Sequence, residues 1–159
     1  MIPQSNMNTS IVHIADFSAQ YSGNFVRSLV CLTQNLKEQW NMDLVLVLPS
    51  EAKERPWLEI FNSHNISVYF INKQQPIWRR FWHLLKIVRQ NRALVLHSHF
   101  TTFDVDVVLV KLFRKVKIVW HMHSPMFQEY RLKQKFKDLI KMRCFGTFGV
   151  TRIVAVSDF

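Results

Sequence analysis

Hydrophobic positions along the chain fall into two kinds of segment that alternate. Six short runs are continuously apolar and rich in β-branched residues, which is typical of strands covered on both faces of a sheet. They lie at residues 11–15, 44–48, 66–71, 94–97, 116–121 and 152–156. Helices are predicted between them, at residues 25–40, 51–64, 76–91, 101–113 and 132–145. Strands that alternate with helices in this way predict right-handed crossovers and a parallel, doubly wound α/β sheet.

Two of the predicted helices carry a clear apolar stripe. Spacings of three and four residues place Phe25, Leu29, Leu32, Leu36 and Trp40 on one helix face. The helix that Pro76 opens is predicted to turn Ile77, Phe81, Leu84, Leu85 and Val88 toward the core. Pro56 is expected to start or kink the helix at 51–64. We expect one Rossmann-like domain over residues 9–159, preceded by a flexible N-terminus of residues 1–8.

Composition excludes several classes of protein. With 48% hydrophobic residues, 3 Gly and 5 Pro, the 159 residues are neither disordered nor collagen-like. No apolar run is long enough for a membrane-spanning helix, and the first ten residues lack the regions of a signal peptide. We therefore expect a cytoplasmic protein in which Cys31 and Cys144 are reduced thiols. No P-loop, nucleophile elbow or His-Glu-x-x-His motif is present in the sequence.

Positive charge is concentrated in the second half of the chain. The net charge is +10, but residues 1–72 carry 4 basic and 6 acidic side chains, whereas residues 73–159 carry 17 and 5. This asymmetry indicates an anionic partner, which is a nucleic acid, an anionic membrane leaflet or a phosphorylated ligand. Ordinary solvated helix faces are the alternative explanation.

The residues that follow the first strand are the first candidates for ligand binding, because ligands of such sheets bind beyond the carboxyl ends of the strands. Ser22, Gly23 and Asn24 open the first predicted helix. Unpaired backbone N–H groups at a helix start, together with the helix dipole, form a site for an anion. An ordinary N-cap made by Ser22 or Asn24 is the alternative.

Histidines mark the ends of the next two candidate strands. His97 and His99 end the fourth strand, and His121, His123 and Ser124 follow the fifth. Side chains two residues apart share a face, so the four imidazoles are expected to gather at one sheet edge if the two strands are neighbours. Such a cluster can bind a metal, transfer protons or hydrogen-bond to a ligand. No carboxylate or thiolate accompanies it, and we therefore predict no metal site.

The helix at 76–91 combines aromatic and basic residues without an acidic one. Its candidate surface residues are Trp78, Arg79, Arg80, Trp82, Lys86 and Arg89. Interfacial helices that bind anionic bilayers have this composition. A solvated helix face whose tryptophans cover neighbouring core residues is the alternative.

The order of these features resembles the N-terminal domain of GT-B fold glycosyltransferases, especially glycosyltransferase family 4. Residues 11–36 are similar to the opening strand-loop-helix unit of that family. Leu-Val-Leu-His-Ser-His-Phe at 94–100, Lys-Ile-Val-Trp-His-Met-His-Ser at 117–124 and Arg-Ile-Val-Ala-Val-Ser-Asp at 152–158 are similar to three later strand ends. The resemblance covers nearly the whole chain, from about residue 8 to residue 159.

The resemblance implies a retaining transfer of a sugar from a nucleotide-diphosphate sugar, with no cofactor besides this donor substrate. It places His123 at the donor sugar as the catalytic residue and the turn at 22–24 at the donor phosphates. His97, His99, His121 and Ser124 would bind substrate. The family's nucleotide-gripping C-terminal domain, with its paired glutamates, is absent from these residues, so we expect a fragment that is inactive alone.

For the acceptor, the resemblance and the basic second half together suggest a lipid-linked saccharide in surface or capsular polysaccharide biosynthesis. The protein would then bind peripherally at the inner face of the cell membrane, with no nucleic acid as partner. The alternative is a basic Rossmann-like module without catalysis that binds nucleic acid or an anionic membrane. A stand-alone Rossmann-like enzyme or nucleotide-binding domain is a further alternative.

Overall fold

A single parallel sheet organises the chain. The computed structural model describes residues 8–100, 102–122, 143 and 149–155. Its strands are β1 (Ser10–Ala15), β2 (Asp43–Pro49), β3 (Ser67–Ile71), β4 (Ala93–His99), β5 (Lys117–Met122) and β6 (Arg152–Ala155). Its helices are α1 (Gly23–Trp40), α2 (Leu58–Ser63), α3 (Ile77–Gln90) and α4 (Asp104–Phe113), with a short 3₁₀ helix at Ser50–Ala52.

The strand order confirms the predicted Rossmann-like fold. The six strands lie in the order β3-β2-β1-β4-β5-β6, and each neighbouring pair is parallel. The chain moves outward in one direction from β1 to β3 and then returns to build the other half from β4. The order therefore reverses between β1 and β4, which is where ligands bind in sheets of this kind.

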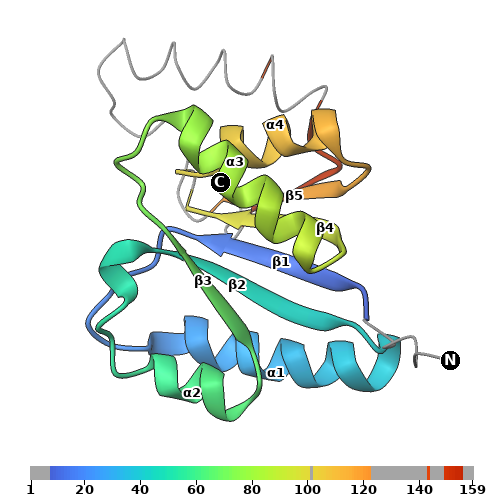
Figure 1. Cartoon of the computed structure of the whole chain (residues 1–159). Helices are drawn as coiled ribbons and strands as arrows, with labels where there is room; N and C mark the ends of the chain where they lie inside the picture. Colours follow the sequence, from blue (N-terminus) through green and yellow to red (C-terminus); the bar gives the residue numbers. More distant parts are fainter. Residues whose placement is uncertain (1–7, 101, 123–142, 144–148, 156–159) are drawn as a thin grey trace, which may run out of the picture.

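Helices cover both faces of the sheet. Figure 1 shows α1 and α2 on one face and α3 and α4 on the other. Right-handed crossovers require this division, because the chain travels in opposite directions in the two halves of the sheet. The parallel strands are apolar on both faces for the same reason.

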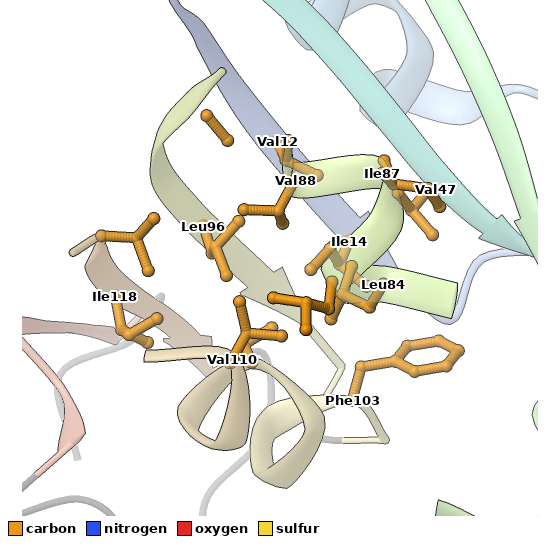
Figure 2. Packing of buried hydrophobic residues seen from close by; sticks show 14 of the residues in the cluster. Val12, Ile14, Val47, Leu84, Ile87, Val88, Leu96, Phe103, Val110 and Ile118 are labelled. Atoms are coloured by element: carbon orange, nitrogen blue, oxygen red, sulfur yellow. The ribbon is translucent and has the colours of Figure 1, made fainter. Parts of the chain in front are cut away.

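The face beneath α3 and α4 is packed with aliphatic residues. Figure 2 shows Val12, Ile14, Leu96 and Ile118 from three adjacent strands meeting side chains of the two helices. The helices contribute Leu84, Ile87, Val88 and Val110, all of which are buried. At roughly 1.5–3 kcal/mol for each fully buried aliphatic side chain, this layer is a main source of stability.

Residues 51–64 do not form the single helix that the pattern predicts. The chain makes the 3₁₀ helix at 50–52, then turns, and α2 begins only at Leu58. Pro56 has no N–H and restricts Arg55 before it, so one helix cannot run through it from residue 51. The expectation that Pro56 starts a helix is met, because α2 begins two residues after it. The predicted helix at 132–145 lies outside the described residues.

Two predicted stripe positions are also wrong. Trp40 is 70% exposed at the end of α1, and Ile77 is 42% exposed at the start of α3. The buried positions of α1 are Val26, Leu29 and Leu36, and Val26 was not part of the predicted stripe. Both errors lie at helix ends, where the helix extends past the sheet. No helix within the described part of the chain has the length and apolar character to cross a membrane.

A buried ion pair links α3 to α4. Arg80 donates from Nε to Asp106 Oδ1 at 3.1 Å and from Nη2 to Oδ2 at 3.0 Å. Its Nη1 also donates to the Lys73 carbonyl at 2.7 Å. The Arg80 side chain is 16% exposed and that of Asp106 only 1%. Arg80 is therefore not part of the exposed helix face on which it was expected: its charge is neutralised inside the fold.

Candidate functional site

Four imidazoles meet on one face of the sheet, at the point where the strand order reverses. The strand register aligns His13 of β1 with His97 of β4, and His99 of β4 with His121 of β5. Register partners in a parallel sheet point to the same face, and so do residues two apart along β4. The prediction that His97, His99 and His121 come together is confirmed, because β4 and β5 are neighbours.

The rings are in direct contact. His13 Nδ1 lies 3.2 Å from His99 Nε2, a hydrogen bond whose direction depends on the tautomers. The His97 ring centroid lies 4.2 Å from that of His99 and 4.6 Å from that of His13. His121 stacks parallel to His97 at 5.4 Å and lies 4.8 Å from His99. His13 and His99 are buried, whereas His97 and His121 are partly exposed.

Burial keeps the deepest of these rings uncharged. Burial, and then the neighbouring His97 and His121, lower the pKa of His13 well below its ordinary value of 6.5. Burial also lowers the pKa of His121. A neutral imidazole donates one hydrogen bond and accepts another. His13 and His121 can therefore position polar groups at neutral pH without adding positive charge.

An aromatic wall connects the imidazoles to the start of α1. Phe25, in the first turn of that helix, meets the His99 ring edge-on at 5.7 Å. Phe17 packs on Phe25 at 4.5 Å, and Phe100 lies 6.2 Å from His99. Phe25, which directly follows the turn at 22–24, therefore connects that turn to the imidazoles.

The turn at 22–24 is not the N-cap that was the alternative interpretation. Ser22 has helical backbone angles and makes no side-chain capping bond. Gly23 has φ +52°, a left-handed conformation that L side chains rarely adopt, and a Cβ there would meet nothing within 4 Å. The glycine is therefore required by backbone conformation rather than by space. Asn24 is exposed.

Polar side chains connect the loops that follow β1, β3 and β4. Asp16, just after β1, accepts hydrogen bonds from Lys73 at 2.9 Å and from Thr102 at 2.7 Å. Lys73 follows β3 and Thr102 follows β4. The hydrogen bond to Asp16 raises the pKa of Lys73. These bonds fix the loops beside the imidazoles.

Not every predicted residue joins this site. His123 and Ser124 lie outside the described residues. The candidate surface residues of α3 lie on the opposite side of the sheet from α1 (Figure 1). His13 was missed, because it lies within an apolar run that reads only as a strand. The available signal was a lone imidazole inside an otherwise apolar segment. A cavity of about 270 Å³ lies at the opposite end of the strands, near Ser10 and Asp43 at the starts of β1 and β2.

A family model describes most of the chain. The model of Glycosyltransferase Family 4 matches residues 25–159. No curated protein sequence matches the chain.

Solved structures share the fold at low sequence identity. A glycosyltransferase from Rickettsia africae is 12% identical with a TM-score of 0.66, and covers 96% of this chain. HepE from Anabaena, solved with UDP-glucose, is 10% identical with a TM-score of 0.64 and covers 93%. A UDP-GlcNAc 2-epimerase from Neisseria meningitidis, bound to UDP-GlcNAc, is 10% identical with a TM-score of 0.55 and covers 87%. The chain spans 37–38% of the length of these three structures.

Proposed function

The chain belongs to Glycosyltransferase Family 4, and from this premise we propose that it forms the acceptor side of a site that transfers a sugar from a nucleotide-diphosphate sugar. The fold alone does not select this reaction, because an epimerase shares it. The family match selects transfer, and the convergence of His13, His97, His99 and His121 beside α1 is the observation that carries the proposal.

A nucleotide-diphosphate sugar is the donor in this proposal. HepE was solved with UDP-glucose and the epimerase with UDP-GlcNAc, and both ligands are of this class. Departure of the nucleotide diphosphate develops negative charge on its phosphates. Backbone N–H groups at the start of α1, with the positive end of the helix dipole, would stabilise that charge. Ser22, Gly23 and Asn24 are the residues assigned to this contact.

The imidazoles would orient the sugar by hydrogen bonds. His13 lies beneath His99 and hydrogen-bonds to it, so it would fix the orientation of that ring. His97, His99, His121 and Ser124 are assigned to substrate. His123 is assigned the catalytic position next to the anomeric carbon, where it would act by position more than by proton transfer. The chain spans about two-fifths of the solved enzymes, so we assign it one side of the site and no turnover by itself.

A lipid-linked saccharide in surface or capsular polysaccharide assembly is the acceptor class in this proposal. Trp78 and Trp82 on α3 are each 56% exposed, and the Arg79 guanidinium lies over the Trp78 ring at 5.0 Å. The end of α4 extends the surface: Phe113 is 59% exposed and lies 6.4 Å from the Trp82 ring. Exposed aromatic rings among basic residues favour an anionic bilayer surface.

Donor binding can be tested by NMR. UDP-glucose is added to the purified chain, with NAD⁺ as the competing ligand class. Amide signals of Gly23 and Asn24 and the ring signals of His99 should shift with UDP-glucose, and His99→Ala should weaken that response. His83→Ala is the control, because His83 is exposed on α3. A response to NAD⁺ that equals or exceeds the response to UDP-glucose would contradict the proposal.

The membrane surface has its own test, which is vesicle flotation. The fraction of the chain that floats with the vesicles should be high when they contain anionic lipid and low when they are neutral. Trp82→Ala should reduce it, whereas Trp40→Ala should not, because Trp40 is 70% exposed but lies on α1. Arg79→Ala should weaken partitioning about fivefold, since one basic residue near such a surface contributes about 1 kcal/mol. Equal recovery on both vesicle types, or equal losses in the two tryptophan variants, would remove the membrane part.

A further inference from the structure

Three of the imidazoles have their nitrogens close enough together to share one ion. His13, His97 and His99 each offer one ligand nitrogen, and these nitrogens lie within 4.8 Å of one another. Two of them, His13 Nδ1 and His99 Nε2, are only 3.2 Å apart. Hydrogen bonding to a sugar does not require three ring nitrogens to lie this close together.

We propose that His13, His97 and His99 bind one divalent transition-metal ion of the Zn²⁺ type, which joins β1 to β4 beneath the substrate site. Imidazole nitrogen is a preferred ligand of Zn²⁺, Co²⁺ and Ni²⁺. In a tetrahedral site with Zn–N bonds of about 2.0–2.1 Å, ligand nitrogens lie about 3.3 Å apart. The His13–His99 separation already matches this spacing, and the His97 nitrogen, within 4.8 Å of the other two, would have to move closer to complete the site.

The surroundings suit such an ion. The two closest ligands are buried, and His97 and His99 are fixed two residues apart on one strand that pairs directly with β1. The His121 ring stands next to this group, with its centroid 4.8 Å from that of His99, and is not itself one of the three proposed ligands.

In this proposal the ion has a structural role. It takes no part in bond cleavage, and the sugar-transfer proposal stands without it. Without an ion, His13 and His99 share the N–H···N hydrogen bond that the structure shows. With an ion, both nitrogens would bind the metal instead. The two descriptions differ in what happens when metal is removed and returned.

The test uses the untagged chain, stripped with a chelator and titrated with Zn²⁺ and then, separately, with Co²⁺. One Zn²⁺ per chain should bind and raise the melting temperature. Co²⁺ should give the intense visible absorption of a tetrahedral site. His97→Gln and His99→Gln should each weaken metal binding by about tenfold or more. His64→Gln and His83→Gln should change nothing, because these two histidines are exposed elsewhere.

Two results would overturn the proposal. One is a wild-type chain that binds no Zn²⁺ after desalting and gives the Co²⁺ spectrum of the free ion. The other is Zn²⁺ binding that keeps the wild-type affinity in both His97→Gln and His99→Gln. The Co²⁺ spectrum is measured on the wild-type chain, so the test holds even if a variant fails to fold.

Discussion

Replacing Arg80 by Ala should destabilise the fold severely, although arginines on helices are usually surface residues. The variant removes two charged hydrogen bonds to Asp106, of 3.1 and 3.0 Å, and leaves a carboxyl that is 1% exposed. Breaking a buried pair in this way costs about 3–5 kcal/mol. For a chain of this size that is a fall in melting temperature of roughly 6–20 °C.

The pH dependence of the loss identifies its cause. Burial raises the pKa of Asp106 above its ordinary value of 3.8, and Arg80 opposes this shift. Without Arg80 the pKa of Asp106 rises further. A carboxyl whose pKa is raised in the folded state is destabilising above that pKa and regains stability as pH falls through it toward the unfolded value. The deficit of Arg80→Ala should therefore shrink on acidification.

Urea unfolding at neutral pH provides the measurement, with Arg79→Ala as the matched control. Arg79 is the exposed neighbour on the same helix, and its variant should stay within about 0.5 kcal/mol of wild type. The double variant Arg80→Met with Asp106→Leu should recover most of the lost stability, because a buried pair can be replaced by apolar residues of similar volume. A loss in Arg80→Ala below about 1 kcal/mol, or no larger than that of Arg79→Ala, would refute the reasoning.

Three further predictions concern the site and the core. In the metal-free chain, the free energy of unfolding should fall as pH drops below 6.5, because His13 binds a proton in the unfolded chain but not in the folded one, where its pKa is lowered. The expected slope is about 1.4 kcal/mol per pH unit. An unchanged slope in His13→Leu would contradict this. Gly23→Ala should lower the free energy of unfolding in urea by about 1 kcal/mol, because φ at this position is +52°. Gly23→Asn should lower it by less, because Asn tolerates the left-handed conformation better. An Ala variant as stable as wild type would show that the left-handed conformation causes no strain. Replacing the buried Leu84 by Ala should lower the free energy of unfolding by about 2–5 kcal/mol, measured by thermal or urea unfolding. Replacing Leu112, which is 74% exposed, should lower it by less than about 0.5 kcal/mol. Similar losses in the two variants would contradict the assigned burial.

The sheet could be predicted from the sequence because its strands are apolar on both faces. Continuous runs such as residues 44–48 identify strands without any knowledge of their partners, and the alternation with helices then restricts the topology to parallel crossovers. For residues 51–64 the single continuous helix was wrong, whereas the expected start at Pro56 is met by α2 at Leu58. Local backbone chemistry decided that segment, and hydrophobic periodicity does not record it.

The role of Arg80 could not be predicted because its partner is 26 residues away on another helix. The sequence shows a helix with several cations and no acidic residue, which is the pattern of an exposed basic face. Only the packing of α3 against α4 brings Asp106 to the guanidinium. The neighbouring Arg79, in contrast, is exposed as the pattern suggests.

Only part of the histidine cluster could be predicted from the sequence, for a related reason. His97, His99 and His121 follow two strands that are consecutive in the chain, so neighbouring strand ends were a reasonable inference. His13 joins them only because β1 lies beside β4, a pairing between residues 86 apart in sequence for His13 and His99. That adjacency belongs to the strand order, which the hydrophobic pattern does not specify.

The two faces of the central strands argue that the imidazoles are there for function. On the side of α3 and α4, positions 12, 14, 96 and 118 are fully buried aliphatic residues. On the opposite side, His13, His97, His99 and His121 stand among aliphatic positions such as Val95 and Val119. Burying imidazoles forgoes hydrophobic stabilisation and desolvates polar nitrogens. A sheet selected for stability alone would place aliphatic side chains on both faces. All four departures from that rule adjoin one another at the point where the strand order reverses, which is where sheets of this kind bind ligands, and this clustering is the physical argument behind the proposed site.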